Sequence, residues 1–209
     1  MKHLPLIIWT ALALCFTASA NIIPTQTTTT GTGPYTWSFD LQLSNDQNIV
    51  SGLAPSTNPV QNTTDYLTGF LTIYDFAGYI PGTCAAPTGW TCTAQNVGFT
   101  PADVVPVDNP NIVNLTWSYT SGPTIVGQAP GVDLGIFSAN SIYSHATQVS
   151  YAARGIKNLG MQIGTISDNV GSTSGPASSV PEPAPAASLA AGLGLAGLVW
   201  KVRRSRSEA

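Results

Sequence analysis

Apolar and polar residues alternate over a nine-residue stretch near the start of the chain, which predicts a β-strand. The apolar positions are Tyr35, Trp37, Phe39, Leu41 and Leu43. Because successive side chains of a strand point to opposite faces, one face would be buried and the other would meet water. A second alternation, over residues 115–120, predicts another half-buried strand.

Residues 70–76 are apolar on both faces, as expected for the central strand of a buried sheet. Residues 132–137, 148–153 and 159–166 are further candidate strands, and turns rich in Pro, Gly and Asn separate them. No segment of this region shows a capped helical period. The pattern predicts an all-β fold, an antiparallel β-sandwich or jelly roll, over residues 21–170.

The first twenty residues have the layout of a secretory signal peptide and predict an N-terminal signal helix. Lys2 precedes an apolar stretch, and Ala18 and Ala20 form a small-residue cleavage site before Asn21. Export through the Sec route is therefore expected, with Asn21 as the new N-terminus. A lipoprotein site at Cys15 fits less well, because the large Leu14 precedes it.

The C-terminal end combines three features in a fixed order. The first is the motif Val180, Pro181, Glu182 and Pro183, and the second is an uncharged apolar run over residues 186–200. The third is a basic cluster of Lys201, Arg203, Arg204 and Arg206. As a helix, the run spans about 22 Å, which is short for a bilayer core of about 30 Å. The basic cluster favours a single transmembrane helix with a cytoplasmic C-terminus over a buried core helix.

Residues 180–206 resemble the PEP-CTERM sorting signal of exported bacterial proteins. The resemblance rests on the three parts in order, at the end of a chain that begins with a signal peptide. It implies recognition by an exosortase, a membrane protease that cleaves near the motif, after transient anchoring in the inner membrane. It further implies a place at the cell surface or in the extracellular matrix, with exopolysaccharide as an associated partner.

The remaining sequence predicts a flexible leader over residues 25–33 and a Gly/Ser/Pro linker over residues 171–179. The whole chain has a formal net charge of −3. Between the signal and the tail, however, eight aspartates face only Arg154 and Lys157, so this region has a net charge near −6. Such an acidic domain argues against nucleic acid and anionic membranes as partners.

Cys84 and Cys92 are the two cysteines left after signal removal. In an oxidising compartment this isolated pair favours a disulfide over a metal site, for which only His145 could add an imidazole. The loop that they close is expected to hold Trp90 at the surface. An alternative function is therefore a carbohydrate-binding or adhesive module with its site near the Cys84–Cys92 loop.

Catalytic chemistry finds little support in the sequence. The sequence contains no nucleophile-elbow motif that would supply a serine nucleophile for His145. The only glutamate before the basic cluster is Glu182, in the sorting motif. Asp40 with Asp46, or Asp103 with Asp108, would be the carboxylate pairs of a glycosidase, but these are typical turn and strand-end residues. We expect no enzyme, cofactor or resident metal. The weaker alternative of calcium rests on the loop that contains Asp103, Asp108, Asn109 and Asn111.

Overall fold

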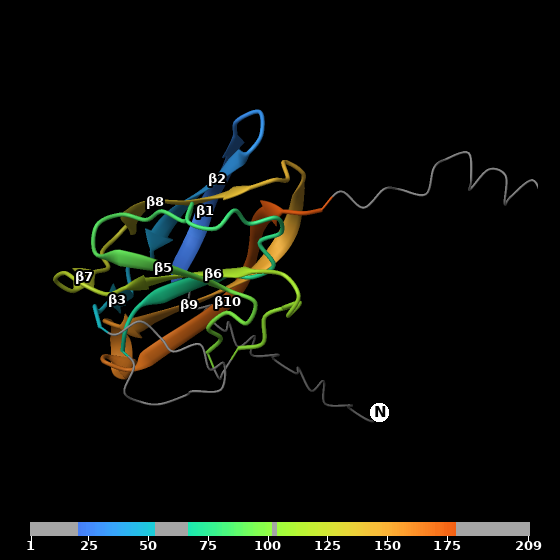
Figure 1. The fold of residues 1–209 in the computed structure, drawn as a ribbon. Helices are drawn as coiled ribbons and strands as arrows, with labels where there is room; N and C mark the ends of the chain where they lie inside the picture. The colour runs from blue at the N-terminus through green and yellow to red at the C-terminus, as the bar shows by residue number, and fades with distance from the viewer. Residues whose placement is uncertain (1–20, 53–66, 102–103, 179–209) are drawn as a thin grey trace, which may run out of the picture.

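The structure is a computed structural model that describes residues 21–52, 67–101 and 104–178. Within these ranges the chain forms two sheets, in which every pair of named strands is antiparallel, and no α-helix. Figure 1 shows the strands of the two sheets stacked against each other. The predicted all-β class is confirmed, and the two packed sheets fit the predicted sandwich.

The smaller sheet has the order β1 (Ile22–Thr30), β2 (Tyr35–Leu43) and β8 (Val132–Ser141). The predicted alternating strand is β2, and its alternate residues from Trp37 to Leu43 are buried. The expectation of a flexible leader over residues 25–33 is wrong, because β1 occupies most of it and pairs with β2. Its four consecutive threonines are β-branched, which suits them to a pleated strand.

The larger sheet is built around one long strand, β9 (Ala146–Lys157). One edge of β9 pairs with β4 (Phe70–Ile73) and then β3 (Gln47–Ile49), and the other edge pairs with β10 (Ile166–Pro176). Beyond β4 lie β6 (Asn114–Tyr119) and β5 (Trp90–Gln95), and beyond β3 lies β7 (Ile125–Val126). The predicted central strand over residues 70–76 is confirmed for Phe70–Ile73, all four of which are buried, whereas residues 74–76 lie beyond the end of β4.

An aromatic core fills the space between the sheets. Phe39 of β2 lies 5.9 Å from Trp117 of β6, and Trp117 lies 5.9 Å from Phe137 of β8, measured between ring centroids. Such tilted and edge-to-face contacts stabilise aromatic cores beyond the burial of their area. The described core residues and both sheets lie within residues 21–178, so this segment contains the contacts that hold the fold together.

The outer face of the larger sheet is also buried over β4 and β6, which differs from the predicted half-buried strand over residues 115–120. All six residues of β6 are buried. The chain after β5 lays Phe99 across this face, with its ring 4.5 Å from that of Phe70. The Phe99 carbonyl accepts hydrogen bonds from the hydroxyls of Thr72 and Tyr74. The polar residues expected to meet water are therefore covered by a loop.

A buried ion pair joins β9 to β10 beneath this covering. Arg154 is 1% exposed, and its Nε and Nη2 donate to the two carboxylate oxygens of Asp168 at 2.7 and 2.8 Å. The guanidinium also lies 5.6 Å from the Phe70 ring centroid and 5.7 Å from that of Phe99. Two parallel hydrogen bonds and two aromatic rings offset the free-energy cost of removing the Arg154 charge from water.

The predicted linker over residues 171–179 is wrong for its first six positions. Residues 171–176 form the second half of β10 and pair with β9. Gly171 and Gly175 are needed for packing, because a Cβ on either would lie about 2.6–2.7 Å from side-chain atoms of Tyr151 or Val149. The composition suggested a spacer, whereas these glycines allow close approach between neighbouring strands.

The candidate strand over residues 159–166 is also wrong. Residues 160–162 form a short 3-10 turn, η1 (Gly160–Gln162), and β10 begins only at Ile166. The predicted signal peptide, residues 1–20, and the predicted transmembrane tail, residues 180–206, lie outside the described residues. Nowhere in the described ranges is a helix long and apolar enough to span a bilayer.

The buried ion pair predicts a large difference between two chemically identical substitutions. Asp168→Asn should lower the free energy of unfolding by about 3–5 kcal/mol, because it leaves the Arg154 charge buried without its counter-charge. Asp46→Asn breaks the more exposed pair with Lys157. It should cost about 1 kcal/mol or less. Urea unfolding of both variants measures the difference, and equal losses would contradict a special role for the buried pair.

Candidate functional site

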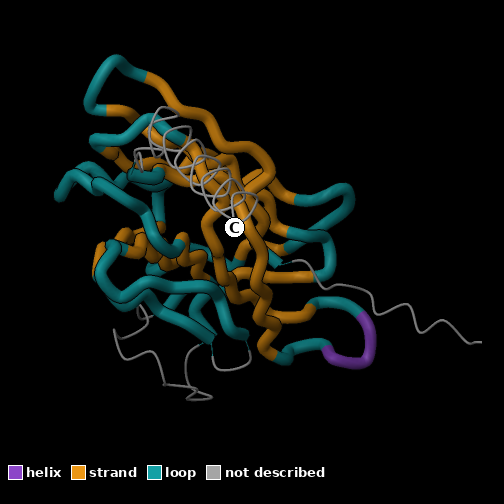
Figure 2. The backbone as a smooth tube through the Cα atoms, turned by 90° about the vertical axis from the view of Figure 1, so that its right-hand side faces the viewer, coloured by secondary structure: helices purple, strands orange, loops and turns teal. Residues whose placement is uncertain are grey.

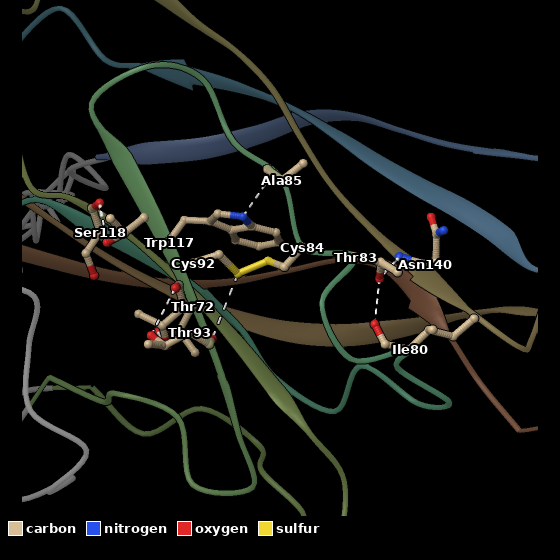
Figure 3. Close-up of a disulfide and its surroundings, with 12 residues drawn as sticks. Thr72, Ile80, Thr83, Cys84, Ala85, Cys92, Thr93, Trp117, Ser118 and Asn140 are labelled. Atoms are coloured by element: carbon tan, nitrogen blue, oxygen red, sulfur yellow. Dashed lines mark hydrogen bonds between the residues drawn. A yellow bond between two sulfur atoms is a disulfide. The ribbon is translucent and has the colours of Figure 1, made fainter.

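The two cysteines form the predicted disulfide, and it connects the two sheets. The Cα atoms of Cys84 and Cys92 are 6.2 Å apart. Cys92 lies in β5 opposite Trp117, whereas Cys84 precedes Ala85, whose backbone pairs with Ser138 of β8. Figure 3 shows the bridge beside the Trp117 indole, which donates a hydrogen bond to the Ala85 carbonyl at 3.1 Å. The bridge therefore closes one side of the sandwich.

Trp90 is not at the surface, which corrects the expectation for the disulfide loop. Its side chain is buried, with the residue 9% exposed, and its ring lies 5.0 Å from Phe137 and 5.3 Å from Tyr119. Trp90 begins β5, and strand pairing turns its side chain into the core. A buried indole cannot stack on a sugar, so a carbohydrate site near Cys84–Cys92 loses the aromatic residue on which it depended.

The polar loop considered for calcium forms a network of internal hydrogen bonds. The Asp75 carboxylate accepts a hydrogen bond from the Asn109 backbone N–H at 2.9 Å. The side-chain oxygen of Asn114 accepts a hydrogen bond from the Asp75 backbone N–H, and its side-chain nitrogen donates one to the Asp108 carboxylate. The side chain of Asn109 accepts from the Asn111 backbone at 3.1 Å. These oxygens accept hydrogen bonds from the loop and its neighbouring residues. Asp103 lies outside the described residues, and the described ones hold no group of three or more acidic, His or Cys side chains placed for a metal.

Electrostatics distinguishes two of the aspartates. Partial burial, together with the nearby charge of Asp108, raises the pKa of Asp75 despite the hydrogen bond from Asn109. For Asp46, burial alone would raise the pKa, but hydrogen bonds from Lys157 and Ser44 outweigh it and lower the pKa. Asp46 is thus held as a carboxylate by its ion pair with Lys157 at 2.7 Å. Asp46 is therefore engaged with Lys157 and is not a free partner for Asp40.

The remaining predicted residues are dispersed. His145 is exposed in the turn before β9. Asn21, the predicted new N-terminus, is fully buried next to β1. Its side-chain amide donates a hydrogen bond to the Ser167 backbone carbonyl, and its backbone carbonyl accepts one from the Ser44 N–H. The cleavage residues Ala18 and Ala20 and all residues of the sorting motif and basic cluster lie outside the described ranges.

The sequence did not reveal a small hollow on the outer face of the three-stranded sheet. It has a volume of about 80 Å³ and is lined by Gln26, Thr28, Ser38, Asp40 and Ile136. Pairing of β1 with β2 and of β2 with β8 brings these residues together. The alternation of Gln26, Thr28 and Thr30 was the available signal, but it lay in the segment interpreted as a leader. The hollow offers one carboxylate, hydroxyl and amide groups and one exposed aliphatic side chain.

Comparison of the chain with models of protein families, with curated proteins and with solved structures finds no match.

The inter-sheet bridge predicts a measurable contribution to stability. Replacing both cysteines, Cys84→Ala with Cys92→Ala, should lower the free energy of unfolding by about 2.5 kcal/mol, because the unfolded chain loses its closed loop. Denaturant unfolding measures the loss, and reduction of the wild-type protein should reproduce it. Thiol labelling of denatured, unreduced protein from an oxidising compartment should detect no free cysteine. Two labelled thiols would contradict the pairing.

Proposed function

We propose that this chain is an exported cell-surface or extracellular-matrix protein that is sorted and cleaved through its C-terminal tail. The observation that carries the proposal is the order of the tail: the motif at residues 180–183, the uncharged run at residues 186–200, and the basic cluster that ends at Arg206. This tail begins just after the last described residue of the sandwich domain, Ser178. The chain is thus organised as one folded domain followed by a delivery signal.

The start of the chain supports the same route. The sandwich begins at Asn21 and Ile22, directly after the expected signal-peptide cleavage site. A disulfide between Cys84 and Cys92 suits an oxidising compartment outside the cytoplasm. In this proposal the protein passes through the Sec route and is held transiently in the inner membrane, with its C-terminus in the cytoplasm.

The tail would act as a protease substrate. Pro181 and Pro183 fix their own φ angles near −65°, and each disfavours the helical conformation in the residue before it. These preferences favour an extended backbone at the motif, and Glu182 supplies its one charge. An exosortase-type membrane protease is the proposed partner. After cleavage the domain would reside in the envelope or matrix, in association with exopolysaccharide.

For the domain itself we propose a structural role and no catalysis. In the described ranges, His145 is exposed, Asp46 and Asp168 are in ion pairs, and Asp75 and Asp108 hold loop backbone and Asn114. These aspartates stabilise the fold, and the arrangement of the described side chains gives no reason to assign a reaction.

The hollow beside Asp40 favours a second candidate, a carbohydrate-binding or adhesive module whose site lies on the smaller sheet. A carboxylate among hydroxyl and amide groups can accept hydrogen bonds from sugar hydroxyls, and Ile136, 63% exposed, offers an apolar contact. For such a module, a glycan array should show saturable binding that Asp40→Asn weakens about tenfold, the effect of one charge-assisted hydrogen bond. A purely structural matrix protein shows no saturable binding.

The sorting proposal predicts that Glu182→Ala leaves export intact and blocks maturation. The uncleaved protein should stay in the membrane fraction because the apolar run and basic cluster still hold it there. It should be larger than the wild-type product by the tail, roughly 3 kDa by the length of residues 180–209. Immunoblotting of membrane and medium fractions measures both properties.

Deletion of residues 201–209 is the matched control, because it keeps the motif and removes the basic stop. The short apolar run then holds the bilayer poorly, and uncleaved protein should leak into the medium. If the wild-type protein and Glu182→Ala both remain full length and membrane-bound, the tail is a simple anchor and the sorting proposal fails.

A further inference from the structure

The connection between β9 and β10 displays three large apolar side chains to solvent. Leu159 is 56% exposed, Met161 105% and Ile163 66%. We call these three residues the apolar tip. Figure 2 shows the connection, with η1 in purple, projecting beyond the strands. Residues 158–167 contain no charged side chain, so no ionic group accompanies the apolar tip.

Hydrogen bonds at the base hold this connection in place. The Asn158 amide donates to the Gln47 carbonyl at 3.1 Å, to Asn48 Oδ1 at 2.8 Å and to the Gly127 carbonyl at 3.1 Å. Next to it, Lys157 forms its ion pair with Asp46. The apolar tip is therefore presented by a base that hydrogen bonds tie to β3 and to Gly127, the residue after β7.

The backbone of the connection also bonds to itself. The Lys157 N–H donates to the Thr165 carbonyl at 2.9 Å, and the Gly164 N–H returns a bond to the Lys157 carbonyl at 2.8 Å. Thr165 donates to the Gln162 carbonyl through both its N–H and its hydroxyl. Peptide groups that are already paired lose less on entering an apolar medium, because fewer bonds to water must be broken.

We propose that the apolar tip inserts into the interfacial layer of a lipid bilayer and forms a membrane contact separate from the C-terminal tail. The tip is a convex projection of three apolar side chains. A stable protein interface buries about 800 Å² per partner and involves some 20–30 residues on each side. Three side chains fall well short of that requirement. A bilayer adapts its shape to a projection and takes up apolar side chains one by one.

The charge of the domain determines which lipids the tip should contact. The described residues include six aspartates, and their two basic residues, Arg154 and Lys157, are both in ion pairs. An anionic lipid surface would repel such a domain. Insertion should therefore depend on apolar contact alone, occur with zwitterionic lipids and be insensitive to salt.

The position of the tip makes this contact independent of the tail. β10 begins next to the tip at Ile166 and ends at Pro176, close to where the tail departs. Along this strand of eleven residues the two ends lie about 33 Å apart. The tip and the tail thus leave opposite ends of one strand, and the proposal can hold or fail whatever the fate of the sorting signal.

Residues 21–178, which contain both sheets and the core, are the protein to use, because the tail would itself bind membranes. The probe is a vesicle of phosphatidylcholine alone, and flotation measures the bound fraction. The triple variant Leu159→Ser, Met161→Ser and Ile163→Ser should reduce the partition coefficient at least about tenfold. Raising the salt concentration should change wild-type binding by less than about twofold. Thermal unfolding checks that both proteins are equally folded.

The matched control removes three apolar side chains of similar exposure elsewhere: Val105→Ser, Val107→Ser and Ile142→Ser. This variant should bind vesicles as the wild type does. Equal losses in both variants, or binding only to anionic vesicles, would overturn the proposal. The proposal also fails if the wild-type protein does not bind the vesicles. It fails in the same way if the tip variant changes only self-association or the capture of another protein.

Discussion

The pairing of β9 along both of its edges is the constraint on which the larger sheet depends. β9 has twelve residues, and β4 and β3 share one edge while β10 occupies the other. This register sets Arg154 between Phe70 and Asp168, so the ion pair forms across neighbouring strands. It also sets Gly155 opposite Ser167, where the absence of a side chain leaves room for Asn21. One strand thereby fixes the buried charge pair and the anchor of the N-terminal end.

Local pattern was sufficient to predict the strands whose two faces differ or are both apolar. The alternation in β2 and the apolar run in β4 report directly on which side chains are buried. Pattern failed where a distant partner decides the conformation. β1 and the second half of β10 have the composition of spacers, yet β2 and β9 supply the hydrogen bonds that make them strands. The outer face of β6 is buried by a loop that places Phe99 there, and periodicity contains no information about that loop.

The same distinction separates the functional features that the sequence could and could not reveal. The predicted signal peptide, the proposed sorting tail and the cysteine pair are each contiguous or closely spaced in sequence, so their residue types and spacing are visible without a fold. The hollow beside Asp40 draws on β1, β2 and β8, which are joined only by strand pairing. Trp90 shows the converse case. Its place in a short loop suggested exposure, but Phe137 and Tyr119 from other strands enclose it.

The connection between β10 and the tail has a mechanical consequence. All eleven residues of β10 pair with β9, and the chain continues from the Pro176 end of that strand. A pull on the C-terminus along the strand direction would load these hydrogen bonds in shear, so that they share the force instead of breaking one after another. The buried pair between Arg154 and Asp168 adds a side-chain link across the same two strands. A domain tethered at this point would therefore resist tension through its longest strand pair, with the two-sheet core behind it.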